Sequence, residues 1–153
     1  MTENINNIVK TIYENLSNGI KLNNMKNILH NIDKKSFEKY IKFCDDKYCK
    51  NNVISNDIFE IIIICWKKGQ SSKIHDHPEN GCLLKILSGS LIEYNYLYEN
   101  NKIIYLNCDI ITDNDDDIGY KESNIILHKI IALEDTISLH IYSPPNYKLN
   151  IYE

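Results

Sequence analysis

The sequence predicts a mainly β protein, a small jelly-roll-like β-barrel with N-terminal helices packed against it. Three observations lead to this expectation. Apolar residues follow helical spacing in the first 45 residues, and short β-branched runs separated by turn residues follow after residue 50. Neither an internal repeat nor an interdomain linker interrupts the 153 residues. We therefore expect a single domain over residues 1–153, with 1–45 as a helical cover and 53–145 as the barrel.

The first 45 residues contain three segments with helical spacing. Apolar residues recur every three or four positions between residues 5 and 16, and a Ser-Asn-Gly stop follows at residues 17–19. A short second helix is expected over residues 22–29. A third helix is expected to run from Ser36, a good N-cap, to Cys44.

After residue 50 the sequence becomes rich in short β-branched and aromatic runs. Residues 58–66 form a nearly continuous run of this kind, which indicates a buried strand. Pro, Gly, Asn and Asp residues divide the rest of the chain into further short strands. We expect these strands around Ile74 and at residues 82–87, 90–98, 102–108, 125–133 and 136–142.

Residues 113–119 are acidic and invite comparison with a calcium-binding loop. An EF-hand loop needs glycine at position 6 and glutamate at position 12. Counted from Asp113, those positions hold Ile118 and Asn124. A solvated loop is therefore the better interpretation of this segment.

The composition excludes several classes of function. The net charge of −4 gives no reason to expect a nucleic-acid partner, and no apolar run is long enough for a membrane span. Five cysteines without a CxxC pair, and an N-terminus without a signal-peptide pattern, favour a reduced, cytoplasmic protein, which we expect to be a monomer. All 17 basic residues are lysines, so any site that would use arginine must use lysine instead.

Two histidines, His75 and His77, stand two residues apart. On a strand, residues i and i+2 point to the same face, so both imidazoles can reach one metal ion. Imidazole nitrogens suit iron, zinc, copper or nickel. A packed, hydrogen-bonded pair would have the same spacing, so the spacing alone leaves a metal site and a structural pair equally open.

A second polar pattern lies near residue 140. Ser138, His140 and Tyr142 alternate with Leu139 and Ile141, so the three polar residues share one face of a strand. A sheet with one wet face would give the same pattern. A Ser-His hydrolase is not indicated, because the serine and histidine are close neighbours on one strand and no nucleophile elbow is present.

The glycines around the histidine pair give a frame that resembles the first signature of the cupin superfamily. Five residues separate Gly69 from His75, and six separate Cys82 from Gly89. Cys82 occupies the glutamate position of that signature, and a cupin with cysteine there resembles a thiol dioxygenase, in particular cysteine dioxygenase. Residues 138–145, Ser-Leu-His-Ile-Tyr-Ser-Pro-Pro, resemble the C-terminal motif of the cysteine dioxygenase family.

This resemblance implies a cupin domain with one iron(II) ion held by His75, His77 and His128. The third histidine follows the pair by about fifty residues, where the second cupin signature supplies its histidine. The rest of that signature is poorly kept: its proline-glycine turn is missing, and Ala132 replaces its asparagine. Glu79 is an alternative fourth ligand, but a turn residue that faces solvent is the better interpretation.

The resemblance also implies roles for the second polar pattern. In the family, a serine, a histidine and a tyrosine form a hydrogen-bonded relay beside the iron, and a thioether can join the tyrosine to a cysteine. These roles would fall to Ser138, His140, Tyr142 and Cys82. Tyr142 would position dioxygen or the substrate carboxylate. The motif further implies a cis peptide bond before Pro144.

Two departures from the family concern the substrate. The family binds the substrate carboxylate with an arginine, and its place here is held by Lys50, close to Tyr48, a second candidate for the pocket. A lysine keeps the charge but loses the bidentate fork. The sequence ends about eight residues after Pro145, so we expect the substrate end of the barrel to be more open. Trp66 is expected to serve packing.

The resemblance predicts an iron-dependent thiol dioxygenase that converts L-cysteine and dioxygen into cysteine sulfinic acid. Two alternatives stay open. Lys50 could mark another small thiol acid as substrate, such as 3-mercaptopropionate, or the chain could be a non-catalytic cupin that binds a metal or small ligand. The complete set of Ser138, His140, Tyr142 and Cys82 favours the enzyme, because a binding protein needs no such relay.

Overall fold

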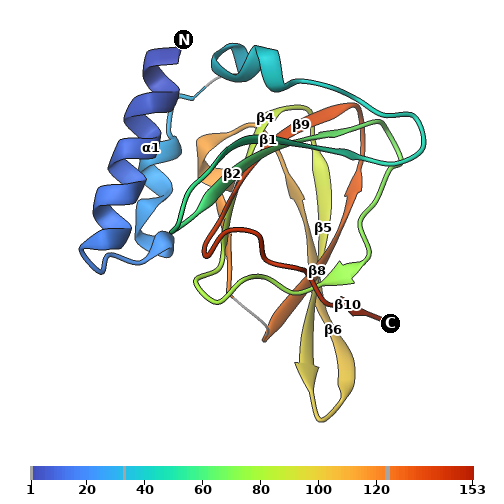
Figure 1. The fold of residues 1–153 in the computed structure, drawn as a ribbon. Helices are drawn as coiled ribbons and strands as arrows, with labels where there is room; N and C mark the ends of the chain where they lie inside the picture. Colours follow the sequence, from blue (N-terminus) through green and yellow to red (C-terminus); the bar gives the residue numbers. More distant parts are fainter. Residues whose placement is uncertain (1, 33, 123–124) are drawn as a thin grey trace.

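The computed structural model describes residues 2–32, 34–122 and 125–153. Two five-stranded antiparallel sheets face each other, and the N-terminal helices lie against the outside of one of them (Figure 1). The expected mainly β, jelly-roll-like fold with a helical N-terminal cover is therefore confirmed. The strands form two separate sheets rather than one closed barrel.

The helical cover consists of α1 (Thr2–Ser17) and two 3-10 helices, η1 (Leu22–Leu29) and η2 (Lys34–Tyr40). The third helix was expected to reach Cys44 and ends earlier, because fully buried Phe37 has a non-helical backbone and the Cys44 carbonyl instead accepts a hydrogen bond from Gln70. The helices bury apolar side chains against the first sheet. This outer core includes Ile8, Ile12, Met25, Leu29 and Phe37 from the helices and Ile61, Ile63, Leu83 and Leu139 from the strands.

The first sheet has the strand order β1-β2-β9-β4-β7. Strand β9 lies at its centre and pairs with β2 on one side and β4 on the other. A cis peptide bond, as the motif implied, joins Ser143 to Pro144 just after β9. The bounds of these strands are β1 (Cys49–Ser55), β2 (Glu60–Trp66), β9 (Thr136–Tyr142), β4 (Cys82–Ser88) and β7 (Gly119–Lys121).

The second sheet has the order β10-β3-β8-β5-β6. The hairpin of β5 and β6 extends away from the helical cover, and β10 adds to the opposite edge beside β3 (Figure 1). The bounds are β10 (Ile151–Tyr152), β3 (Ile74–His75), β8 (Ile126–Ala132), β5 (Leu91–Glu99) and β6 (Lys102–Ile111).

Three strands were not predicted from the sequence: β1, β7 and β10. Strand β1 is an edge strand with the polar sequence Cys-Lys-Asn-Asn-Val-Ile-Ser, and none of its residues is fully buried. Strands β7 and β10 have three and two residues. They exist because β4 pairs with β7 and β3 pairs with β10, and such pairing leaves no hydrophobic pattern in so short a segment.

Strand β2 shows why the first sheet has two buried faces. All seven of its residues are buried. Ile61 and Ile63 belong to the outer core under the helices, whereas Ile64 and Trp66 belong to a second core between the two sheets. Apart from Glu79, every side chain discussed below as a candidate ligand or substrate contact lies on or beside this inner layer.

The acidic segment 113–119 is held more firmly than a solvated loop would be. It contains the short helix η3 (Asp115–Asp117). Asp115 pairs with the ammonium group of Lys85, a buried side chain of β4, and accepts a hydrogen bond from the backbone N–H of Asn31 at 3.1 Å. The expectation of a purely solvated segment is therefore wrong for Asp115.

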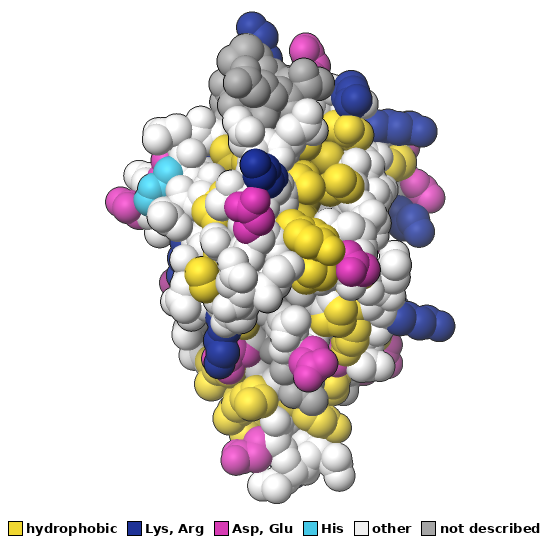
Figure 2. Space-filling view, turned by 60° about the vertical axis from the view of Figure 1, so that its left-hand side comes forward, with side chains coloured by type: hydrophobic (Ala, Val, Ile, Leu, Met, Phe, Trp, Pro, Cys, Tyr) yellow, Lys and Arg dark blue, Asp and Glu magenta, His cyan; other side chains and the backbone are white. Residues whose placement is uncertain are grey.

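Acidic and basic side chains are mixed over the face shown in Figure 2, without a large area of one sign. Within the described part of the chain, no helix has the length and apolarity needed to cross a membrane.

Candidate metal centre and substrate pocket

Three histidines converge in the inner layer. His75 on β3 lies directly opposite His128 on β8, and His77 follows two residues after His75. The Nε2 atoms of His75 and His77 each lie 3.0 Å from the Nε2 atom of His128. These three buried residues, the histidine cluster, are a set that could hold one metal ion.

The Nδ1 atoms, the outer nitrogens of the cluster, show where two of these rings carry their protons. His75 Nδ1 lies 2.7 Å from the carbonyl oxygen of Lys73, and His128 Nδ1 lies 2.7 Å from Oε2 of Glu93. A carbonyl and a carboxylate only accept hydrogen bonds, so both Nδ1 atoms must donate. The facing Nε2 atoms of His75 and His128 are therefore two bare lone pairs in close contact.

Two such lone pairs repel each other unless a cation lies between them. Two imidazole nitrogens bound about 2.1 Å from one ion at right angles are about 3.0 Å apart, which matches both Nε2 contacts in the cluster. Burial lowers the pKa of all three histidines, and mutual repulsion lowers it further at His77 and His128. The rings are thus neutral and ready to bind metal, and an all-imidazole set fits a divalent transition metal.

His77 differs from the other two histidines at its outer nitrogen. Its Nδ1 atom is buried and has no hydrogen-bond partner in the part of the chain that the structure describes. An unsatisfied buried polar atom destabilises a fold. No described neighbour fixes the tautomer of the His77 ring as Lys73 and Glu93 fix those of His75 and His128.

Glu93 on β5 supports His128 from behind and was not predicted as a site residue. Its other carboxylate oxygen lies 3.0 Å from the ammonium nitrogen of Lys121, which also donates to Asn95 Oδ1 at 2.8 Å. A carboxylate that accepts the second N–H of a ligating histidine fixes the ring and makes it a stronger ligand. In the sequence, Glu93 and Asn95 alternate with apolar residues, and that pattern equally fits a face that points to solvent.

Ser138, His140 and Tyr142 form a polar chain along the inner face of β9. Ser138 Oγ lies 2.8 Å from His140 Nε2, and the Tyr142 hydroxyl lies 3.3 Å from His140 Nδ1. The indole N–H of Trp66 donates to Ser138 Oγ at 2.9 Å, so Trp66 has a polar role beyond the packing expected of it. The sequence alternation placed the three residues of the polar chain on one face, and the structure brings them into contact.

The contacts of Ser138 favour one direction for the protons of the polar chain. Trp66 can only donate, so Ser138 accepts from it and directs its own proton elsewhere. His140 Nε2 at 2.8 Å is a better acceptor than the Ile64 carbonyl at 3.5 Å. His140 then donates from Nδ1 to the Tyr142 oxygen, which leaves the phenol proton available to a ligand.

Burial keeps the members of this chain neutral. It lowers the pKa of His140 to about 3, and the positive charge of Lys50 adds to the shift. It raises the pKa of Tyr142 well above that of a free phenol. At neutral pH the chain therefore holds a neutral imidazole and a protonated phenol.

Cys82 on β4 lies directly opposite Tyr142 on β9. Residues in such a pair point to the same face with Cβ atoms about 4.5–5.5 Å apart, so the thiol lies beside the ring. Burial raises the pKa of the Cys82 thiol, although the hydrogen bond with Tyr142 opposes the shift. A protonated thiol is a poor metal ligand. Cys82 is therefore placed as a contact of Tyr142 and not as a candidate metal ligand.

A small pocket with a cavity volume of about 10 Å³ opens beside the histidines. Tyr48 stacks on Trp66 in its wall, with ring centroids 4.4 Å apart. Lys50 stands at the rim with an exposed side chain, and its partial desolvation lowers the pKa of its ammonium group while the charge of Glu60 opposes the shift. Other wall residues are His75, His128, His140, Tyr142 and Leu149.

A substrate end more open than in the family stays a prediction, and the structure shows which residues lie at that end. Leu149 forms part of the pocket wall, and the segment around it continues into β10, which pairs with β3 beside His75. Leu149 was not predicted as a pocket residue. Its contribution depends on a pairing across about 75 residues of chain, which no local pattern reports.

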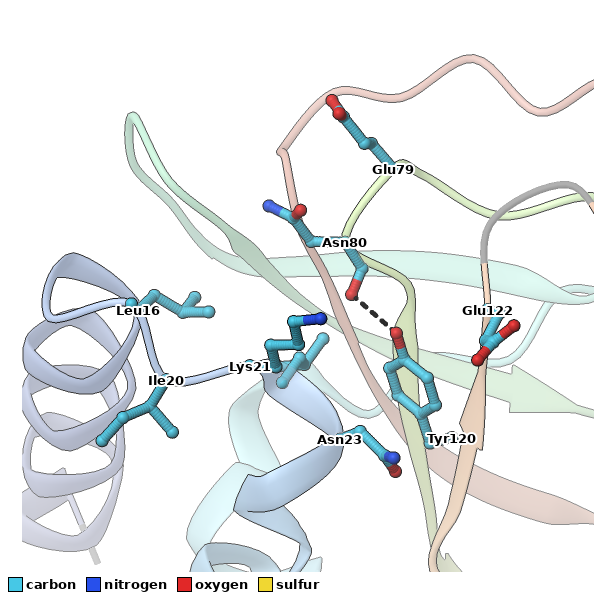
Figure 3. A pocket seen from close by; sticks show the side chains of 10 residues that line it. Leu16, Ile20, Lys21, Asn23, Glu79, Asn80, Tyr120 and Glu122 are labelled. Carbon is cyan, nitrogen blue, oxygen red and sulfur yellow. Dashed lines mark hydrogen bonds between the residues drawn. The ribbon is translucent and has the colours of Figure 1, made fainter.

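Glu79 lies outside this pocket. It is exposed and lines a separate hollow between the end of α1, η1 and β7 (Figure 3). In that hollow the Tyr120 hydroxyl donates to the Asn80 carbonyl at 3.2 Å. Glu79 is not part of the histidine cluster, so the structure gives no support to a fourth ligand at this position.

Two facing antiparallel sheets with three histidines converging between them define a cupin-type protein with a candidate metal centre. Solved structures support the fold. A double-stranded β-helix protein from Klebsiella pneumoniae is similar with a TM-score of 0.57 and 17% identity, over 81% of this chain and 93% of that one. An oxalate decarboxylase from Lactobacillus farciminis is similar with a TM-score of 0.57 and 18% identity, over 75% and 34%.

The sequence narrows this class to one family. The family described as cysteine dioxygenase type I matches residues 3–153, so the chain belongs to that family. It is 35% identical to cysteine dioxygenase type 1 of Bos taurus over 69% of this chain and 56% of that protein. It is 28% identical to the enzyme of the same name from Danio rerio, over 94% and 76%. The chain thus spans less than two thirds of the bovine relative.

Proposed function

We propose that this protein is an iron(II)-dependent thiol dioxygenase that converts L-cysteine to cysteine sulfinic acid with both atoms of dioxygen. Family membership indicates the reaction. The observation that carries the proposal is the histidine cluster, in which the bare Nε2 atoms of His75 and His128 lie 3.0 Å apart in a set that could hold a metal ion. Bound there, one iron(II) ion per chain would supply the redox chemistry that couples dioxygen to a thiol.

In this proposal His75, His77 and His128 hold the iron. Three neutral ligands leave the full positive charge of the ion for other groups to neutralise, and a soft substrate thiolate is well suited to do so. Glu93 fixes the orientation of His128, and its negative charge is balanced by Lys121.

Lys50 and Tyr48 would bind the substrate at the mouth of the pocket. The Lys50 ammonium is the cationic group in the described pocket wall and would pair with the carboxylate of the amino acid. Burial also raises the pKa of Tyr48, so its hydroxyl stays protonated and can donate a hydrogen bond.

Tyr142 would position dioxygen or the substrate carboxylate with its phenol proton. Ser138 would hold His140 through Nε2, and His140 would donate from Nδ1 to the Tyr142 oxygen. The phenol proton would then stay directed into the pocket. We further propose that Cys82 can be joined to Tyr142 by a thioether. That bond links the sulfur to a ring carbon with loss of two hydrogen atoms, and dioxygen is the oxidant that takes them.

One observation favours a second candidate substrate. A single ammonium at Lys50 recognises a carboxylate without the bidentate geometry that arginine provides, so the pocket could favour a simpler thiol acid such as 3-mercaptopropionate. We also propose that the protein acts in the cytoplasm, because all five cysteines are unpaired in the structure. A monomeric state stays a prediction.

Oxygen uptake tests the proposal. The protein is loaded with iron(II) without oxygen and then supplied with dioxygen and either L-cysteine or 3-mercaptopropionate, and the product is weighed by mass spectrometry. Uptake with a gain of two oxygen atoms on L-cysteine supports the proposal. Turnover of 3-mercaptopropionate alone would assign the second substrate. Bound iron without uptake on either thiol would leave a non-catalytic cupin.

A further inference from the structure

We propose that residues 146–152 form a strap that is held in place by Asp76 and that limits, through Leu149, the size of the thiol admitted to the metal centre. The choice of a thiol as the ligand rests on the proposed function. The strap itself is seen in the structure, where it follows the cis peptide bond and crosses to the second sheet as β10 (Figure 1).

Asp76 stands between His75 and His77, yet it is not a member of the histidine cluster. Its side chain is turned toward the strap and only 1% of the residue is exposed. One carboxylate oxygen accepts from the backbone N–H of Asn150 at 2.9 Å. The other accepts from the Asn150 side-chain amide at 2.8 Å and from the Tyr152 hydroxyl at 3.3 Å.

Each of these donors belongs to the strap. A buried carboxylate is costly unless hydrogen-bond donors satisfy it. In the described part of the chain the donors that satisfy Asp76 come from Asn150 and Tyr152, so the charge favours the state in which the strap is docked. We therefore assign Asp76 as a positioning residue for the strap.

Backbone pairing joins the strap to the ligand-bearing strand. Ile151 lies opposite His75 and Tyr152 opposite Ile74 in the β10–β3 ladder. The backbone N–H of Asp76 also donates to the Asn150 carbonyl at 3.3 Å. A shift of the strap would thus break contacts on both sides of His75.

Leu149 is the part of the strap that reaches the pocket. It lines the same wall as His75, His128 and Tyr142, and it is partly buried there. Two positions later, Ile151 is 51% exposed and does not line the pocket. An apolar side chain beside the metal centre offers no hydrogen bond to a ligand, so its effect on selectivity is steric.

Thiol binding to the cobalt(II)-loaded protein, followed by absorption without oxygen, tests the role of Leu149. L-cysteine is compared with L-penicillamine, which carries two extra methyl groups beside the sulfur. Leu149→Ala is expected to improve the affinity for penicillamine relative to cysteine by about tenfold, the size of a steric effect of one or two methyl groups. Leu149→Phe should worsen it, and Ile151→Ala, the matched control, should leave the ratio unchanged. An unchanged ratio in both Leu149 variants would overturn the inference.

Hydrogen exchange in the metal-free protein tests the role of Asp76. Asn150→Ala removes one donor without altering the barrel, and it is expected to speed exchange of the backbone amides of residues 150–152 by about tenfold. Lys148→Ala, an exposed neighbour, should not. Equal exchange in Asn150→Ala and the wild type would overturn the strap. Neither experiment needs dioxygen, so both remain decisive if the proposed oxidation fails.

Discussion

The histidine cluster and the polar chain lie in the same buried layer, but their hydrogen-bonding capacity is satisfied in different ways. In the polar chain each contact joins a donor to an acceptor, and the indole N–H of Trp66 satisfies the Ser138 end. In the cluster, His75 and His128 present two acceptors to each other at 3.0 Å. The polar chain therefore pairs its donors with acceptors and leaves the phenol proton of Tyr142 for a ligand, whereas the cluster sets two acceptors against each other, as a metal site would.

This difference separates buried histidines that could bind a metal ion from buried histidines that orient a neighbouring side chain. Burial lowers the pKa of His128 and of His140 alike, so neither burial nor charge distinguishes them. The partners of their nitrogens do. The outer nitrogen of His128 is occupied by Glu93 and its inner nitrogen faces the bare Nε2 atom of His75, while both nitrogens of His140 are paired with hydroxyl groups.

Removal of a cluster histidine is expected to have the largest effect. His77→Ala should reduce bound iron from one per chain to almost none and lower oxygen uptake about 1,000-fold or more, because the metal supplies the chemistry. Metal analysis and oxygen uptake measure both effects. His30→Ala, a surface histidine, is the control. Normal iron content in His77→Ala would break the distinction between the two groups.

A change in the polar chain should leave the metal in place. Tyr142→Phe removes only the hydroxyl, so iron content is expected to stay at the wild-type value while kcat falls about 100-fold, the scale of a lost proton donor. Steady-state kinetics with parallel metal analysis give both numbers. Tyr105→Phe alters an exposed tyrosine and should change neither. Loss of iron from Tyr142→Phe would mean that the polar chain also serves in binding.

Glu93 contacts the histidine cluster through His128. Its replacement therefore tests whether orienting one ring affects metal binding. Glu93→Gln is expected to weaken metal affinity about 10- to 100-fold, because a neutral amide replaces the charged carboxylate that accepts from His128. Cobalt(II) titration measures the affinity. Glu93→Gln combined with Lys121→Met avoids an unpaired ammonium, and Glu99→Gln on the exposed end of β5 is the control. Unchanged affinity in the double variant would show that Glu93 serves only the fold.

Acid should destabilise the metal-free protein through the buried histidines of both groups. The folded-state pKa of His75, His77, His128 and His140 is lowered by burial, so protons bind the unfolded chain first. Stability is therefore full above pH about 6.5 and is lost as pH falls toward the folded values, for His140 about 3.

Each buried histidine contributes up to about 1.4 kcal/mol per pH unit in that window. Urea unfolding between pH 8 and pH 5 should show the loss, and His140→Gln should make the slope shallower. His30→Ala should leave it unchanged. An equal slope in His140→Gln and the wild type would contradict the assignment of a neutral, buried His140.

Local patterns predicted the parts of the structure that depend on near neighbours. The alternation at residues 136–142 gave strand β9 with its observed bounds, and it placed the polar chain on one face. The spacing of His75 and His77 gave two ligands of the cluster. His128 could be added only through the family resemblance, because its place opposite His75 is set by the pairing of β3 with β8.

The remainder depends on contacts between distant segments. Glu93 and Lys121 meet because β5 and β7 lie near the same inner layer, and Leu149 reaches the pocket because β10 pairs with β3. Strand β1, which carries Lys50, escaped prediction because an edge strand of polar residues lacks a hydrophobic pattern. In each case strand pairing decides the neighbours, and pairing leaves no mark in a short sequence window.

X-ray absorption of the iron(II) protein, prepared without oxygen, tests the central claim most directly. The account predicts three imidazole nitrogens at about 2.1 Å and no sulfur ligand, followed by one new sulfur ligand at about 2.3 Å when L-cysteine is added. A sulfur ligand before L-cysteine is added, or fewer than three imidazoles, would contradict the assignment of the histidine cluster as the complete protein ligand set.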